Sequence, residues 1–299
     1  MPELPDIVVY LEALDRRIVG ERVLGFRVMS PAVLRTYQPA YSEVEGATVI
    51  GVSRIGKRIV LALDSGLTIV IHLMIAGRLK WVDVPRAPIP KKVGLAAWDF
   101  PGGTLVLTEQ GTKKRAGIWV FADGAAAAAE NRGGVEPLEV DPAGFTEALL
   151  SENRTLKRAL TDPRIFSGIG NAYSDEILWE AGLSPVKLTG RLTEVEIRRL
   201  HGAVLSSLSK WIEMLRAEVG EGWPVKVTAF RPEMAVHGKY GEPCPRCGAS
   251  VQRIVYADNE TNYCPGCQTG GKLLADRSLS RLLGEDWPKT LEELEERRA

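Results

Sequence analysis

Residues 237–268 read HGKYGEPCPRCGASVQRIVYADNETNYCPGCQ and contain all four cysteines of the 299-residue chain. The cysteines form two pairs, Cys244-Pro-Arg-Cys247 and Cys264-Pro-Gly-Cys267, with the spacing C-x2-C-x16-C-x2-C. Two thiolates two residues apart on a tight turn can face one ion, and two such turns complete a tetrahedral site for Zn²⁺. Redox-active pairs or disulfides are the alternative, which this spacing in a cytosolic chain disfavours. We therefore predict one structural zinc ion, held on a β-hairpin that turns at Asp258-Asn259-Glu260.

A glycine-rich turn precedes this segment. In FSGIGNAYSDEILWEAGLSP, Gly168-Ile169-Gly170-Asn171 separates two stretches with helical character. Glycines let backbone amides approach an anion, and the N-terminus of the following helix attracts negative charge. A structural turn is the plainer interpretation of the motif alone. The basic residues Arg154, Lys157 and Arg158 just before it favour a DNA phosphate, with Asn171 as a side-chain donor.

The first half of the chain is rich in β-branched runs. We expect a helix over DIVVYLEALDRRIV, starting after Pro5, and a hairpin from about Gly51 to Leu73 with turn residues Asp64-Ser65-Gly66. A second hairpin is expected to turn at Pro101-Gly102-Gly103. Further along, LTEVEIRRLHGAVLSSLSKWIEMLRAEVG predicts a long amphipathic helix capped by Thr193 and Glu196.

Composition narrows the class of protein without identifying it. Hydrophobic content of 45% and charged content of 25% are ordinary for a globular chain, and the length suits two domains. Net charge is zero, so whole-chain charge does not indicate nucleic acid, although basic residues cluster locally. The N-terminus lacks the features of a signal peptide, and no apolar run is long enough for a bilayer. We expect a cytoplasmic, nucleoid-associated monomer with no membrane partner.

Five stretches of the chain together resemble the formamidopyrimidine-DNA glycosylase/endonuclease VIII family of DNA repair enzymes. They are Pro2-Glu3-Leu4-Pro5-Asp6, the GKR around Lys57, His72-Leu73 followed by Gly77, the run from Lys157 through GIGNAYSDEIL, and the finger HGKYGEPCPRCG…TNYCPGCQ.

The resemblance implies an α+β fold with two domains. An N-terminal β-sandwich flanked by helices is expected over residues 1–135, and a helix–two-turn–helix domain over 136–234. The four-cysteine β-hairpin zinc finger would cover 235–270, followed by a helical extension over 271–299. Damaged DNA would run between the domains with the damaged nucleotide flipped out of the stack.

The resemblance also implies the chemistry. Removal of Met1 would leave Pro2 with a free amine, which titrates near neutrality and attacks the sugar C1′. Glu3 would move protons, and Lys57 is the third catalytic residue. Base release would be followed by β-elimination, with δ-elimination left open. The residues expected to contact DNA are His72, Ile75, Lys114, Arg115, Lys157, Asn171, Lys239 and Asn259.

Simpler interpretations of two of these features remain. Pro2-Glu3 alone would be an ordinary chain terminus, and His72 could be a buried strand histidine hydrogen-bonded inside the sandwich.

The sequence departs from the family at the groups that handle the base. Asn259 stands where the finger usually carries an arginine, so the charge of that phosphate contact is lost. Ile75 and Lys114 replace the methionine and arginine that fill the gap left by the flipped base, and Ala116 replaces a phenylalanine. The missing aromatic wedge favours lesions that are already unstacked, or single-stranded and bubble DNA, unless another residue acts as the wedge.

Two further departures concern loops. The stretch EVGEGWPVKVTAFRPEMA is shorter than in members that cap an oxidised purine, which argues against 8-oxoguanine as the main substrate. About thirty residues follow Cys267, and they look helical and end acidic.

Two alternative functions follow from these observations. One is a catalytically weak or inactive member of the family that binds damaged DNA, which Ala116 and Asn259 favour and the intact Pro2, Glu3 and Lys57 disfavour. The other is a zinc-ribbon protein of translation or transcription, which explains the cysteines but not the N-terminus.

Overall fold

The computed structural model describes residues 1–299 except 112, 257–258, 276–280, 285–287 and 297–299, and the side chains of Tyr256, Asn259 and Glu295 are also outside this description. The chain forms two compact units. The first comprises Met1–Arg132 and Trp211–Ala229, and the second comprises Gly133–Lys210 and Phe230–Ala299. The domain boundaries expected from the sequence follow the chain order, so they assign residues 211–229 to the helix–two-turn–helix domain, whereas these residues belong to the first unit. Within the described residues, no helix is long and apolar enough to cross a membrane.

Two four-stranded antiparallel sheets form most of the first unit, with the orders β1-β6-β7-β5 and β2-β3-β4-β8. The expected hairpin over residues 51–73 is a three-stranded meander, because the chain also turns at Gly56-Lys57. The strands are β1 (Gly25–Val28), β2 (Val49–Ile55), β3 (Arg58–Leu63), β4 (Thr68–His72), β5 (Gly77–Val82), β6 (Gly94–Phe100), β7 (Gly103–Glu109) and β8 (Gly117–Phe121).

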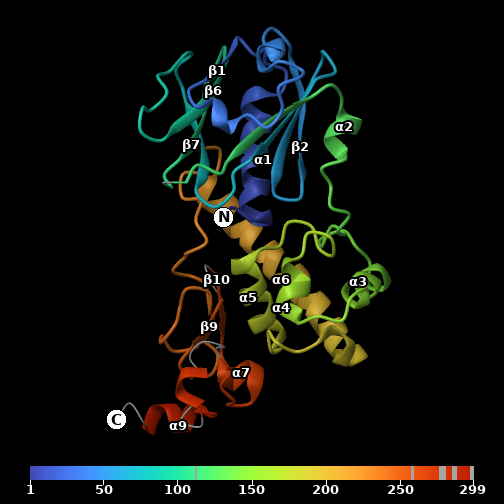
Figure 1. Ribbon diagram of the computed structural model, residues 1–299, viewed down its shortest axis with the longest axis vertical. Coiled ribbons are helices and arrows are strands. Elements are labelled where there is room, and N and C mark those ends of the chain that lie inside the picture. The colour runs from blue at the N-terminus through green and yellow to red at the C-terminus, as the bar shows by residue number, and fades with distance from the viewer. Residues whose placement is uncertain (112, 257–258, 276–280, 285–287, 297–299) are drawn as a thin grey trace. The chain divides into compact units, whose positions relative to one another are not determined.

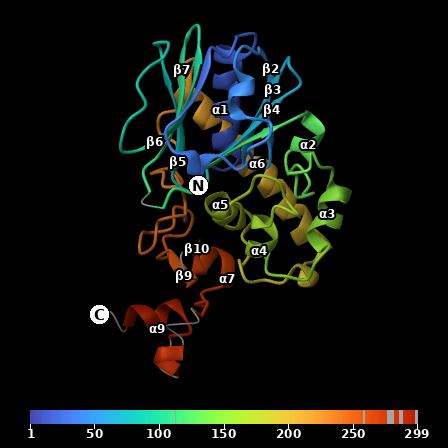
Figure 2. The same cartoon turned by 45° about the horizontal axis from the view of Figure 1, so that its top comes forward.

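The helix α1 (Leu4–Ile18) lies between the two sheets, as Figures 1 and 2 show. It begins two residues earlier than expected, because a proline in the first turn has no amide that needs a partner. Its buried stripe contains Ile7, Tyr10 and Leu14, which join the main core of the sandwich. The unit also contains the short helices η1 (Pro31–Val33), η2 (Tyr41–Val44) and α2 (Gly124–Ala128).

The second unit is helical. The helical stretch before the glycine turn is interrupted after Leu150, so that it forms two helices, α3 and α4. The cap predicted for the long helix is confirmed, because Glu196 N donates to Thr193 Oγ1 at 3.3 Å and Thr193 N donates to Glu196 Oε2 at 2.9 Å. The helices are α3 (Pro142–Leu150), α4 (Leu156–Thr161), α5 (Asn171–Ala181), η3 (Thr189–Arg191) and α6 (Glu194–Val219), whose residues from Trp211 onward belong to the first unit.

A β-hairpin and a short helix complete the second unit. Strands β9 (Gln252–Tyr256) and β10 (Asn259–Tyr263) pair antiparallel, and α7 (Pro265–Thr269) follows directly. Figure 2 shows this hairpin and α7 beside α5. The expected turn at residues 258–260 falls partly outside the described residues. The acidic helix α9 (Leu291–Glu296) agrees with the helical character expected for the C-terminal extension.

Candidate active site and zinc finger

The N-terminal amine is partly buried among charged side chains. Burial lowers the pKa of the Met1 amine, Glu3 opposes this shift, and Arg78 lowers the pKa further. Asp6 and Lys57 make smaller contributions of opposite sign. Glu3 is the N-cap of α1 and Asp6 lies in its first turn. Lys57 lies in the β2–β3 turn and Arg78 lies on β5, so the fold of the first unit brings these groups to the amine. The arrangement favours an uncharged amine beside a carboxylate.

Glu3 is positioned by the start of α1. Its backbone amide donates to Asp6 Oδ2 at 2.9 Å, and Glu3 is only 2% exposed. Pro2 is buried as well. A glutamate fixed at the N-cap of a helix and buried beside the chain terminus can exchange protons with whatever the terminus binds.

Lys57 and His72 lie at neighbouring strand ends. Lys57 occupies the β2–β3 turn after Gly56, whose φ of 60° suits glycine. His72 ends β4 and pairs with Arg58 of β3. Burial, Arg58 and Lys57 lower the pKa of His72 to about 4. The imidazole is therefore neutral near pH 7, so any contact with a phosphate would be a neutral hydrogen bond.

The two segments expected to fill the gap left by a flipped base differ in exposure. Ile75 lies in the β4–β5 turn and is 57% exposed. The other segment is fixed by Glu109, whose Oε2 accepts from Arg115 N at 2.8 Å, and whose backbone oxygen accepts from Lys114 Nζ. The side chains of Lys114 and Arg115 are exposed, whereas Ala116 is buried in the sandwich core. Ala116 therefore offers no wedge.

Lys157 and Asn171 make contacts inside the second unit. Lys157 is 9% exposed, and its Nζ donates to Asn171 O at 2.6 Å and to Asp175 Oδ1 at 2.5 Å. Asn171 Nδ2 donates to Glu260 O at 2.9 Å, which ties the glycine turn to β10. In this geometry Lys157 stabilises the turn that presents Asn171, and direct phosphate binding by either residue stays a prediction.

Two adjacent acids of α5, Asp175 and Glu176, form hydrogen bonds with the residues just before the finger, and the sequence interpretation missed both. Asp175 Oδ2 lies 2.8 Å from His237 Nδ1 and accepts from Asn262 N at 3.1 Å. Glu176 accepts backbone hydrogen bonds of 2.8–3.0 Å from residues 235–237. Burial raises the pKa of Glu176, and these three amides oppose the shift. The acidic pair that begins four residues after Asn171 was the signal available.

The remaining residues expected to contact DNA lie near the finger. Lys239 forms a 3.1 Å ion pair with Glu242. Asn259 is the first residue of β10, and its side chain lies outside the description. Its role in binding DNA stays a prediction.

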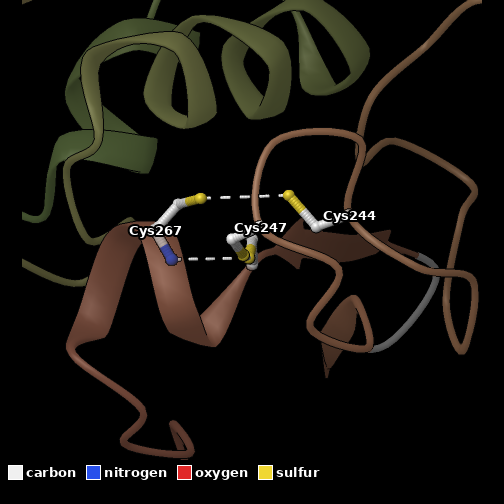
Figure 3. A group of neighbouring side chains, drawn as sticks. Cys244, Cys247 and Cys267 are labelled. Carbon is white, nitrogen blue, oxygen red and sulfur yellow. Dashed lines mark hydrogen bonds between the residues drawn. The ribbon is translucent and has the colours of Figure 1, made fainter.

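The four cysteines converge as the spacing predicted. Their sulfurs all lie within 4.8 Å of one another. Cys244 Sγ and Cys267 Sγ are 3.9 Å apart, one from the loop before β9 and the other from α7, as Figure 3 shows. Trp179 Nε1 donates to Cys244 Sγ at 3.3 Å. Four sulfurs at this separation fit the tetrahedral preference of one structural Zn²⁺.

Comparison with known proteins agrees with this architecture, which is that of a DNA glycosylase with a helix–two-turn–helix domain and a zinc finger. Family models match residues 1–115 (formamidopyrimidine-DNA glycosylase N-terminal domain), 134–220 (formamidopyrimidine-DNA glycosylase H2TH domain) and 241–270 (zinc finger found in FPG and IleRS). The chain belongs to the formamidopyrimidine-DNA glycosylase family.

Individual relatives support the assignment over nearly the whole chain. Formamidopyrimidine-DNA glycosylase of Lactococcus lactis subsp. cremoris is 30% identical over 278 residues, covering 90% of this chain and 99% of the relative. The Thermus thermophilus enzyme is 32% identical over 284 residues, covering 91% and 100%. An uncharacterised formamidopyrimidine-DNA glycosylase-like protein of Mycobacterium tuberculosis is 41% identical over 150 residues, covering 50% of this chain and 93% of that protein.

Solved structures of the Lactococcus lactis enzyme have the same fold. Its complex with DNA that contains an oxidised pyrimidine superposes with a TM-score of 0.79 at 29% identity, covering 90% of this chain and 100% of that one. Its complex with DNA that contains an abasic site gives a TM-score of 0.78 at 28% identity, covering 89% and 99%.

Proposed function

We propose that this chain is a bifunctional DNA glycosylase and AP lyase of base excision repair, with the Pro2 amine as its nucleophile after removal of Met1. The observation that supports the assignment best is the group around the chain terminus. Pro2 and Glu3 are buried just before α1. The Met1 amine beside them has Asp6, Lys57 and Arg78 as charged neighbours. Burial and two cations favour an amine whose lone pair is available.

The chemistry follows from these groups. The Pro2 nitrogen forms a bond to the sugar C1′ as the bond from C1′ to the base breaks, and Glu3 supplies the proton that opens the sugar ring at its oxygen. The resulting iminium withdraws electrons, so the adjacent C2′ loses a proton and the bond from C3′ to its phosphate oxygen breaks. Analysis of the DNA ends decides whether a second elimination follows.

The DNA contacts belong to the proposal as well. His72 and Arg115 of the first unit would contact phosphates, and Ile75 and Lys114 would enter the gap left by the flipped base. In the second unit Lys157, Asn171, Lys239 and Asn259 would contact the backbone. The structural zinc holds the finger in shape and takes no part in the reaction. We also propose that the protein acts in the cytoplasm on nucleoid DNA.

Borohydride trapping on DNA with a single abasic site tests the proposal, because reduction of the iminium leaves a covalent adduct. Protein that starts at Pro2 is expected to form the adduct, and Pro2→Gly or a retained N-terminal extension to reduce it strongly. The matched control carries the extension with a protease site that restores Pro2, and cleavage is expected to restore trapping. Binding of lesion-containing DNA without trapping or nicking would instead support an inactive DNA-binding protein.

A further inference from the structure

The three residues after η1 lie along the edge of β8 in the first unit. Leu34 forms a parallel bridge with Ile118, and Arg35 N donates to Ile118 O at 2.8 Å. Thr36 exchanges two hydrogen bonds with the backbone of Val120, of 2.8 and 3.1 Å. These three residues therefore act as a short extra strand beside β8, and this pairing fixes the backbone from which the Arg35 side chain extends.

The guanidinium of Arg35 reaches the residues just before β8. Its Nη2 donates to Arg115 O at 3.1 Å and to Ala116 O at 3.2 Å. A Cβ added at Gly117 would meet Arg35 Nε at 2.9 Å and Trp119 Cη2 at 2.8 Å. Because Gly117 has no side chain, the guanidinium has the room to approach these two carbonyl groups.

Glu109 binds the amides of the same two residues. Its Oε2 accepts from Arg115 N at 2.8 Å and from Ala116 N at 3.1 Å, and Glu109 is only 1% exposed. Both amides and both carbonyls of Arg115 and Ala116 are thus bound by two side chains, one acidic and one basic. Hydrogen bonds from a guanidinium are stronger than those between neutral groups. The backbone of Arg115 is therefore fixed, although its side chain is exposed.

We propose that Arg35 is a positioning residue that holds Arg115 in place for its contact with a DNA phosphate. The inference rests on the proposed function, which assigns that contact to Arg115. An arginine on a fixed backbone loses less conformational freedom when it binds, so its contact contributes more affinity. This matters in a chain whose Ala116 offers no wedge, since other contacts must offset more of the cost of unstacking. Arg35 acts through the backbone of Arg115 and makes no contact with DNA in this role.

A double-mutant cycle on DNA binding tests this role. The probe is a duplex with a single tetrahydrofuran, a stable analogue of an abasic site, so that binding is measured without reaction. Arg35→Ala should weaken binding about fivefold, and Arg115→Ala should weaken it at least as much. In the double variant, Arg35→Ala should add less than about a twofold loss, because the residue that it positions is already absent.

Arg22→Ala is the matched control for the cycle. Arg22 is an exposed arginine of the same unit, and its Nε also donates to a backbone carbonyl, that of Gly46 at 2.7 Å. The substitution removes the same charge without touching the residues before β8. Binding of the duplex by Arg22→Ala should therefore stay within about twofold of wild type.

The salt dependence of binding gives a second readout, which a purely structural role would not change. The slope of log affinity against log salt concentration reports how many phosphates the protein neutralises. Arg115→Ala should reduce this slope by about one, Arg35→Ala should reduce it toward the same value, and the double variant should reduce it no further. A second reduction of the slope, or additive losses of affinity, would show that Arg35 acts independently of Arg115 and would overturn the proposal.

The same measurements separate the inference from the proposed function. Wild-type protein that does not bind the duplex would refute the proposed function. If Arg115→Ala binds as tightly as wild type, the phosphate contact of Arg115 is refuted, and the inference fails with it. Weakened binding by Arg115→Ala together with normal binding by Arg35→Ala would refute the role of Arg35 alone.

Discussion

Lys157 and Asp175 form a buried ion pair 2.5 Å long between α4 and α5. The same carboxylate contacts His237, before the finger, and Asn262 of β10. One side chain thus connects three segments that are distant in sequence. Since the ammonium also holds the carbonyl of Asn171, the pair fixes the turn from which that residue would reach DNA.

Removing one partner of this pair is expected to destabilise the second unit strongly. Asp175→Ala leaves a buried ammonium without its counter-ion, which costs about 3–5 kcal/mol of unfolding free energy. Hydrogen exchange of the α5 amides under increasing urea measures the loss in this unit. The control is Glu242→Ala, which removes the more exposed ion pair to Lys239 and should cost about 0–1 kcal/mol. Similar small losses of unfolding free energy in both variants would show that the buried pair stabilises the protein no more than the exposed pair does.

The zinc site gives a second prediction. Cys247→Ser removes one of four converging ligands, so bound zinc should fall from one equivalent per chain toward zero, and residues 241–270 should lose protection from proteolysis. Metal analysis and limited proteolysis measure both effects. Arg246→Ala is the control, because this neighbour packs on Trp179 and supplies no ligand. Full zinc content in Cys247→Ser, or equal zinc loss in Arg246→Ala, would contradict the four-cysteine assignment.

Local patterns in the sequence predicted local structure well. The cysteine spacing predicted the cluster, and Thr193 with Glu196 predicted the start of α6, because both depend on residues close in the chain. Trp223 could not be assigned in this way, since its partner Leu79 is distant in sequence and the contact exists only after folding. The burial of Ala116 could not be predicted from the sequence either, because it also depends on tertiary packing. Asp175 was missed because a helical acid is usually solvated, and only the tertiary fold places it under the finger.

The third prediction concerns acid stability. The pKa of His72 is about 4 in the folded chain and about 6.5 when unfolded, so the unfolded chain binds more protons between these values. Stability from the neutral imidazole is therefore full above pH 6.5 and is lost as the pH falls toward 4. Between pH 7 and pH 5 the loss should be about 1–2 kcal/mol for this residue.

Urea unfolding at the two pH values measures this effect. His72→Asn should flatten the pH dependence by that amount, whereas His201→Asn, in the second unit, should leave the unfolding of the first unit unchanged. An equal pH dependence in wild type and His72→Asn would show that His72 titrates normally.

The last prediction concerns Ile75, the exposed residue of the β4–β5 turn. If its side chain fills the gap left by a flipped base, it offsets part of the unstacking cost, which exists only in duplex DNA. Ile75→Ala should then slow base release from a duplex about tenfold while changing release from the same single-stranded oligonucleotide little. Single-turnover rates on both substrates measure the difference. Val84→Ala is the control, since Val84 is similarly exposed beyond the far end of β5. Equal losses on duplex and single strand would assign Ile75 to general DNA binding, and no loss on either would remove it from the DNA-binding surface.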